Sequence, residues 1–137
     1  MKMKTKITEQ EQPVTTEDIE HIEKQFGFTM PENLKKLYLK YNGGVLESGE
    51  NSYDLDSIKY GNSRMEESID SFQITEQHIP REYLPFATTP IGHIICIYTG
   101  NGSKNGSIFL FRYDEMEPVF YNRNLEDFLA IDSIEEL

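Results

Sequence analysis

Residues 93–122, HIICIYTGNGSKNGSIFLFRYDEMEPVFYN, decide the fold class of this chain. Two apolar stretches, 93–99 and 107–113, are separated by a run of Gly, Asn and Ser that has the composition of a turn. A second tight turn at 114–116 leads into a third stretch, 117–122. This pattern predicts an antiparallel meander. Because the first two stretches are apolar on both faces, we expect a curled sheet with helices packed against it.

Two helices are predicted upstream of this sheet. The first begins at Thr15, a capping residue followed three positions later by Asp18, and it ends at Gly27. Its apolar residues recur at helical spacing, at Ile19, Ile22 and Phe26. The second begins at Pro31, and its inward face is formed by Leu34, Leu37, Tyr38 and Tyr41. The run 42–44 ends it, and the short link between the two helices predicts a helical hairpin.

The other segments give weaker signals. Residues 45–82 are the least clear, with a short edge strand at 54–60, a weak helix or loop at 64–72 and a helical turn at 75–78. Tyr83–Ala87 is a short strand interrupted by Pro85, which favours a sheet edge or the start of a strand. A last helix begins at Asn124 and turns its apolar residues inward, namely Leu125, Phe128 and Leu129.

These segments together predict an α+β fold. An N-terminal helical hairpin and a C-terminal helix are expected to pack on a mostly antiparallel, curved sheet. Residues 1–14 are expected to form a flexible N-terminal arm, and residues 15–137 a single domain.

The charge balance constrains the partners. The chain has 137 residues with 13 Lys and Arg against 24 Asp and Glu, a net charge of −11. Such a surface repels nucleic-acid phosphates and anionic membranes, so we expect no direct binding to either. It suits a basic protein partner reached by electrostatic steering, although solubility alone would also account for it. The sequence has no run of about 20 apolar residues and no secretory-signal pattern, so we expect a cytoplasmic protein.

Several motifs resemble the SUKH superfamily, which includes the fungal SMI/KNR regulators of cell-wall synthesis and many bacterial immunity proteins. The specific part is the pair LYLKYNGG at 37–44 and LPFA at 84–87, in that order and separation. The resemblance spans about residues 15–130, and Met30 and His93 depart from the usual residues of the family. Supporting segments are EDIEHIEKQFG at 17–27, MPENL at 30–34, GHIICI at 92–97 and IFLFRYDE at 108–115.

The resemblance implies binding rather than chemistry, with no cofactor. We expect an immunity protein that binds and neutralises a cognate, basic, nuclease-type toxin of a polymorphic toxin system. The alternative is a regulatory adaptor of the SMI/KNR type in cell-wall or stress signalling. In either role the chain is expected to be a monomer or a weak homodimer. The motif residues are interpreted as scaffold: Pro31, Tyr41, Asn42, Gly43, Gly44, Pro85, Phe86, Ala87 and Gly92.

The candidate partner-binding surface consists of acidic clusters with neighbouring aromatic residues. Tyr53 and Tyr60 flank the first cluster and would serve as aromatic anchors. An ordinary solvated acidic surface is the alternative interpretation of each cluster. The three clusters are Asp54 with Asp56, Glu66 with Glu67 and Asp70, and Asp114 with Glu115 and Glu117.

The residue pattern gives no support for catalysis or metal binding, so we expect no enzyme. Cys96 is the single cysteine; it lies on the opposite strand face from His93 and is expected to be a buried apolar residue. The histidines lack metal-ligand spacing. The segment 54–56 matches the DxD pair of glycosyltransferases, but the chain lacks a βαβ pattern, so turnover of a sugar nucleotide is the weakest hypothesis.

Overall fold

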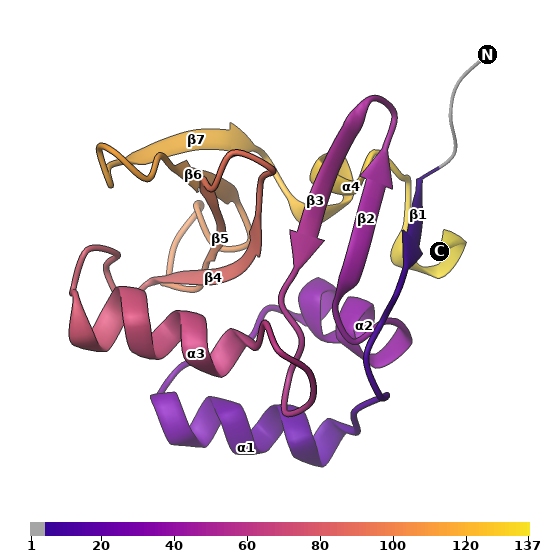
Figure 1. Cartoon of the computed structure of the whole chain (residues 1–137), viewed down its shortest axis with the longest axis horizontal. Helices are drawn as coiled ribbons and strands as arrows, with labels where there is room; N and C mark the ends of the chain where they lie inside the picture. The colour runs from indigo at the N-terminus through magenta and orange to yellow at the C-terminus, as the bar shows by residue number, and fades with distance from the viewer. Residues whose placement is uncertain (1–4) are drawn as a thin grey trace.

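The computed structural model describes residues 5–137, which form four α-helices and a seven-stranded antiparallel sheet (Figure 1). This confirms the predicted α+β class. Within these residues every helix falls short of the length and apolarity needed to cross a bilayer. The helices are α1 (Thr16–Phe26), α2 (Glu32–Lys40), α3 (Met65–Ile69) and α4 (Leu125–Leu129), with a π-helical turn η1 (Asp70–Thr75) and a 3-10 turn η2 (Ile134–Glu136). The strands are β1 (Lys6–Thr8), β2 (Gly44–Ser48), β3 (Asn51–Leu55), β4 (Tyr83–Thr88), β5 (Ile94–Tyr98), β6 (Ile108–Phe111) and β7 (Pro118–Asn122).

Strands that are neighbours in the sheet are also neighbours in sequence. The meander predicted at 93–122 is confirmed as β5, β6 and β7, each antiparallel to the next. The β5–β6 loop is closed by two backbone hydrogen bonds of Tyr98, one from its N–H to the Ser107 carbonyl and one to its carbonyl from the Gly106 N–H, both 2.9 Å. The run rich in Gly, Asn and Ser is therefore a hairpin loop.

Strand β1 lies within the segment that the sequence assigns to an arm. It pairs with β2, with Ile7 opposite Leu46, and both side chains are buried. The Thr5 hydroxyl donates a hydrogen bond to the Leu129 carbonyl oxygen at 2.7 Å. Residues 5–8 are thus tied to the domain by sheet pairing and by burial of Ile7, whereas residues 1–4 lie outside the described residues.

The shortest strand pairing in the sheet is between β3 and β4, and we call this junction the β3–β4 seam. These strands share only two residue pairs, Asp54 with Thr88 and Leu55 with Ala87. In Figure 1, β1–β3 stand upright whereas β4 and β7 lie across the view, so the sheet turns here. Both β3 and β4 are interior strands, whereas the sequence favours edge positions. Pro85 is tolerated inside the sheet because β4 no longer pairs with β3 at that position.

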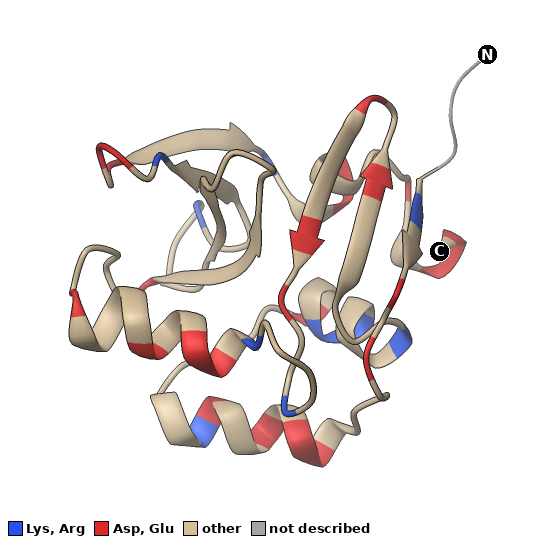
Figure 2. Ribbon diagram, viewed as in Figure 1, with Lys and Arg blue, Asp and Glu red and all other residues tan. Residues whose placement is uncertain are grey.

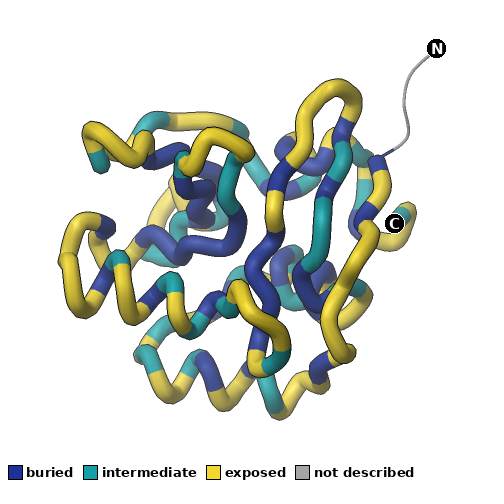
Figure 3. The backbone as a smooth tube through the Cα atoms, viewed as in Figure 1, coloured by how far each residue is buried: buried dark blue, intermediate teal, exposed yellow. Residues whose placement is uncertain are grey.

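The side chains of β5 alternate between two apolar clusters. Ile95 and Ile97 belong to the larger cluster, which also holds the buried side chains of α1, α2, α3 and α4. Ile94 and Cys96 belong to the smaller cluster, together with Tyr83 of β4. Figure 3 shows the buried segments gathered between the helices and the sheet. Both faces of β5 are thus covered by apolar side chains, which accounts for its apolar residues on both faces.

Helix α1 begins and ends where the sequence predicts. The Thr15 hydroxyl accepts a hydrogen bond from the Asp18 N–H at 3.2 Å, and the Asp18 carboxylate accepts one from the Thr15 N–H at 3.0 Å. These two bonds form a capping box, which satisfies N–H groups that the helix cannot. Gly27 ends the helix with a left-handed φ of 71°.

Candidate functional site

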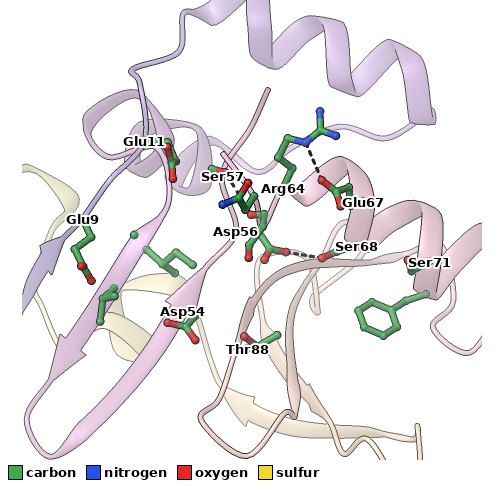
Figure 4. A pocket seen from close by; sticks show the side chains of 16 residues that line it. Glu9, Glu11, Asp54, Asp56, Ser57, Arg64, Glu67, Ser68, Ser71 and Thr88 are labelled. Atoms are coloured by element: carbon green, nitrogen blue, oxygen red, sulfur yellow. Dashed lines mark hydrogen bonds and ion pairs between the residues drawn. The ribbon is translucent and has the colours of Figure 1, made fainter. Parts of the chain in front are cut away.

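A surface hollow of about 530 Å³ lies beside the β3–β4 seam (Figure 4). We call it the Asp56 hollow. It collects residues from the segment before α1, from both sides of the seam, from the loop that precedes α3, and from α3 and η1. Its polar lining consists of Glu9, Glu11, Asp54, Asp56, Ser57, Asn62, Ser63, Arg64, Glu67, Ser68, Ser71 and Thr88.

Asp56 is the buried acid of this hollow, with 6% of its surface exposed. Its Oδ2 accepts a hydrogen bond from the Ser68 hydroxyl at 2.8 Å, and its backbone N–H donates to the Phe86 carbonyl oxygen at 2.8 Å. Strand β3 ends at Leu55, so the two-residue alternation that would expose Asp56 beside Asp54 is broken there. The first acidic cluster is therefore split, with Asp54 exposed and Asp56 turned inward.

The electrostatics of Asp56 follow from this burial. Burial raises its pKa to about 7, the Ser68 hydrogen bond opposes the rise, and the charges of Asp54, Glu66 and Glu67 add to it. Within residues 5–137, the second carboxylate oxygen, Oδ1, accepts no hydrogen bond, yet it is not sealed from the hollow. Figure 4 shows one carboxylate oxygen directed at Ser68 and the other turned away from it.

A second hollow, of about 660 Å³, lies between α1 and α3. We call it the α1–α3 hollow. It shares Arg64 and Glu67 with the Asp56 hollow. Lys59 crosses it, with its Nζ 3.1 Å from Asp18 Oδ1 and its backbone N–H donating to Glu66 Oε2 at 2.8 Å. Its charged lining consists of Glu17, Asp18, Lys59, Arg64, Glu66, Glu67 and Asp70.

The two hollows together form what we call the acidic face. Two basic residues, Lys59 and Arg64, lie on it, and each already pairs with an acid of the face, Lys59 with Asp18 at 3.1 Å and Arg64 with Glu67 at 2.9 Å. Figure 2 shows the acidic residues along α1, α3 and the segment before α1. The face can therefore attract and orient cationic groups. Its nine acids are Glu9, Glu11, Glu17, Asp18, Asp54, Asp56, Glu66, Glu67 and Asp70.

The third predicted cluster does not join this face. Asp114, Glu115 and Glu117 lie in the turn between β6 and β7, which Figure 2 places at the far end of the sheet from β1. Glu115 lies 3.9 Å from Arg112, and both side chains are about half exposed. This cluster has the properties of a solvated turn.

The two predicted aromatic anchors differ in exposure. Tyr53 is buried against Phe128, with ring centroids 4.8 Å apart, and its hydroxyl shares a 2.8 Å hydrogen bond with that of Tyr121. It points into the core because it occupies an inward position of β3, so it is not a surface anchor. Tyr60 is half-buried at the edge of the acidic face, and the Lys59 ammonium lies 5.3 Å from its ring centroid.

The residues interpreted as scaffold lie in turns, caps and the core. Gly43 and Gly44 have left-handed φ values of 80° and 109°, and a Cβ on Gly44 would lie 2.3 Å from the Thr8 carbonyl oxygen. Asn42 is fully buried. The others are Pro31 before α2, Tyr41 at its end, Pro85, Phe86 and Ala87 within β4, and Gly92 in the β4–β5 turn.

The thiol and the imidazoles lie apart from the acidic face, except for His21. Cys96 is fully buried, as predicted, and burial raises the pKa of its thiol well above the ordinary range. His93 Nδ1 accepts a hydrogen bond from the Tyr113 N–H at 3.2 Å. Across residues 5–137, no three His, Cys, Asp or Glu side chains are arranged to hold a metal ion.

Four of the nine acids of the acidic face lie outside the clusters that the sequence predicts. The sequence places Glu9 and Glu11 in the arm, and it places Glu17 and Asp18 only at the start of α1. Their place beside α3 depends on the path of the chain across the sheet, which no local pattern reveals. Residues 9–23 hold six acidic residues and no Lys or Arg, and that run is the available signal.

The sequence model of the SMI1 / KNR4 family (SUKH-1) matches residues 13–131 of the chain. No curated protein sequence matches the chain. The matched segment holds α1–α4 and β2–β7, and it leaves β1, Glu9 and Glu11 outside.

Proposed function

Because the chain belongs to the SMI1 / KNR4 family (SUKH-1), whose members are protein-interaction domains, we propose that it is an immunity protein. In this role it binds and neutralises a cognate toxin that acts inside the cell. The bound toxin is blocked by occlusion and charge, without any reaction catalysed by the immunity protein itself.

The observation that carries this proposal is the acidic face. It gathers nine carboxylates around two adjoining hollows, while its two basic residues are already engaged by those carboxylates. Opposite charges across an interface speed the encounter of the partners and fix their register. The net charge of −11 extends the same preference over the whole molecule.

The same face suits a nuclease-type toxin in particular. Nucleases bind phosphates with clustered Lys and Arg side chains, because the backbone of nucleic acid carries a dense negative charge. A surface that presents many carboxylates competes for those side chains. Binding of this chain at the basic cleft of a nuclease would therefore exclude its substrate.

The test is co-expression with the toxin domain encoded beside this gene. We expect the chain to restore growth, to co-purify with the toxin, and to bind it less tightly as the ionic strength rises from about 0.05 M to about 0.5 M. Glu9→Lys with Asp70→Lys, on the acidic face, should weaken binding about tenfold or more. Asp114→Lys with Glu115→Lys is the matched control and should change binding by less than about twofold.

Two results would contradict the proposal. The first is the lack of a neighbouring toxin gene together with no toxin among the co-purified proteins. The second is a growth defect on deletion of the gene in a strain that holds no toxin, which is the phenotype of a regulatory adaptor. Equal weakening by both double variants would instead show that the acidic face is not the binding surface.

A further inference from the structure

The fold does not need a carboxylate at position 56. Only 6% of the surface of Asp56 is exposed, and burying a carboxylate costs free energy unless its oxygens are hydrogen-bonded or paired with a charge. Ser68 pairs with Oδ2 at 2.8 Å, a bond that an Asn or Gln side chain would also accept. Within residues 5–137, Oδ1 has no hydrogen-bond partner and opens into the Asp56 hollow.

The charged groups that line the Asp56 hollow are mainly carboxylates. Glu9, Glu11 and Asp54 supply carboxylates at the rim, and Thr88 adds a hydroxyl across the seam. Among residues 5–137 that line this hollow, Arg64 is the one basic side chain. Its Nε donates to Glu67 at 2.9 Å rather than to Asp56. Within residues 5–137, none of the hydroxyl, amide or guanidinium groups that line the hollow donates a hydrogen bond to Oδ1.

We propose that the Asp56 hollow receives one arginine side chain of the protein partner, and that Asp56 Oδ1 accepts a hydrogen bond from its guanidinium group. The inference rests on the proposed function only for the identity of the protein that carries this arginine. Guanidinium presents five N–H donors in a rigid plane and is weakly hydrated. It therefore suits a hollow of about 530 Å³ whose acceptors approach from several elements. A metal ion instead needs its oxygens gathered at about 2.0–2.6 Å.

Binding of this cation is coupled to a proton. Burial holds part of the Asp56 population protonated at neutral pH, since its pKa is raised to about 7. An arginine against Oδ1 favours the ionised form, so the proton leaves as the cation binds. Because binding requires the ionised form, the apparent affinity should rise about tenfold between pH 6 and pH 8.

Other charged or titratable groups also act on this site. They are Asp54 on β3, Glu66 and Glu67 on α3, Arg64 before α3, and, behind the carboxylate, Tyr38 on α2 and Cys96 on β5. Burial raises the pKa of both Tyr38 and Cys96, so these two groups stay neutral across this pH range. The rim carboxylates Glu9 and Glu11 lack buried surroundings and are exposed.

The experiment uses N-acetyl-arginine methylamide as the probe and the full chain labelled for NMR. We expect the probe to change the chemical shifts of the Asp56 carboxyl carbon and of the Ser68 and Thr88 amides. The titration should fit a single binding site, and the affinity should rise with pH. Asp56→Asn keeps an acceptor for Ser68 and should weaken probe binding about tenfold or more. Arg64→Gln removes the positive charge that repels the probe from the rim, and it should tighten probe binding about threefold. Asp114→Asn is the control and should leave binding unchanged.

Other results would overturn the inference. Equal shifts at Asp114 and Asp56 would indicate screening by a diffuse ion atmosphere. Equal affinity for N-acetyl-lysine methylamide would remove the case for a guanidinium, and tighter binding of Mg²⁺ at the same residues would assign the hollow to a metal. Should Asp56→Asn not fold, Arg64→Gln still decides, since unchanged or weaker binding in that variant contradicts the proposal. Toxin neutralisation without probe binding would refute this inference and leave the proposed function standing. Probe binding by a chain that neutralises no toxin would refute the proposed function and leave this inference standing.

Discussion

The side-chain amide of Asn42 is hydrogen-bonded to both the N–H and the carbonyl oxygen of Ile58. Its side-chain Oδ1 accepts a hydrogen bond from the Ile58 N–H at 2.7 Å, and its Nδ2 donates to the Ile58 carbonyl oxygen at 2.9 Å. The same Nδ2 donates to the Gln12 carbonyl oxygen at 2.8 Å. One buried amide thus joins the end of α2 to the loop that carries Asp56 and to the segment that carries Glu9 and Glu11.

Replacing Asn42 by alanine should therefore destabilise the domain strongly. The change leaves the buried Ile58 N–H without a partner. It also removes the bonds to the Ile58 carbonyl oxygen, which still accepts from the Tyr60 N–H, and to the Gln12 carbonyl oxygen. We expect a loss of about 2–4 kcal/mol in the free energy of unfolding. Urea denaturation followed by circular dichroism measures it. Asn33→Ala is the control, because Asn33 bonds only to the partly buried Glu126 carboxylate, and it should cost about 1 kcal/mol or less. Equal costs for the two variants would refute the linking role of Asn42.

Gly44→Ala should detach the first strand. A Cβ at this position would meet the Thr8 carbonyl oxygen at 2.3 Å, with φ at 109°, so β1 must move away. We expect a loss of about 2–4 kcal/mol and faster hydrogen exchange in residues 6–8. Gly27→Ala shares a left-handed φ, 71°, but a Cβ there has no neighbour within 4 Å. It should cost only about 1 kcal/mol, with exchange in β1 unchanged.

Asp56→Asn should change how stability depends on pH. The folded-state pKa of Asp56 is raised to about 7, against an ordinary value of about 3.9. Between these values the folded state binds more protons than the unfolded state, so this group makes stability fall as pH rises from about 4 to about 7. The wild-type protein should therefore lose up to roughly 4 kcal/mol relative to Asp56→Asn over that window.

Urea denaturation of both proteins at a series of pH values tests this. The two curves should run parallel below about pH 3 and above about pH 8, because the protonation of Asp56 is then the same in both states. A difference that stays constant from pH 4 to pH 8 would contradict the raised pKa.

Cys96 should react with a thiol reagent only when the domain opens. The thiol is fully buried and its pKa is raised, first by burial and then by the charge of Asp56. We expect Ellman's reagent to react with the native protein about a thousandfold more slowly than with the urea-unfolded chain. Rapid reaction of the native protein would show that the smaller apolar cluster is open to solvent.

Local signals in the sequence were enough for much of the fold. The cap at Thr15 and the stop at Gly27 predicted α1, and the paired apolar stretches predicted the β5–β7 meander, because each signal acts within a few residues. Strands β1 and β2 gave no such signal. Ile7 is the only apolar residue in three-residue β1, and its burial depends on Leu46, nearly forty positions away.

The candidate site was predictable only in part. The acids of 54–56 and 66–70 were recognised as clusters, and the fold brings them to one face. The inward turn of Asp56 was not predictable, because it depends on where β3 stops and on the Phe86 carbonyl that its N–H meets. Alternation along a strand would have exposed Asp56 together with Asp54.

The β3–β4 seam leaves one wall of the Asp56 hollow with few ladder hydrogen bonds. The Asp56 hollow has Asp54 and Leu55 on one side of this two-pair junction and Thr88 on the other. The larger apolar cluster crosses this junction, with Leu55 on one side and Phe86 on the other. Side-chain packing rather than strand pairing therefore fixes the width of the hollow, and a core substitution at either residue would alter the access of a partner side chain to Asp56.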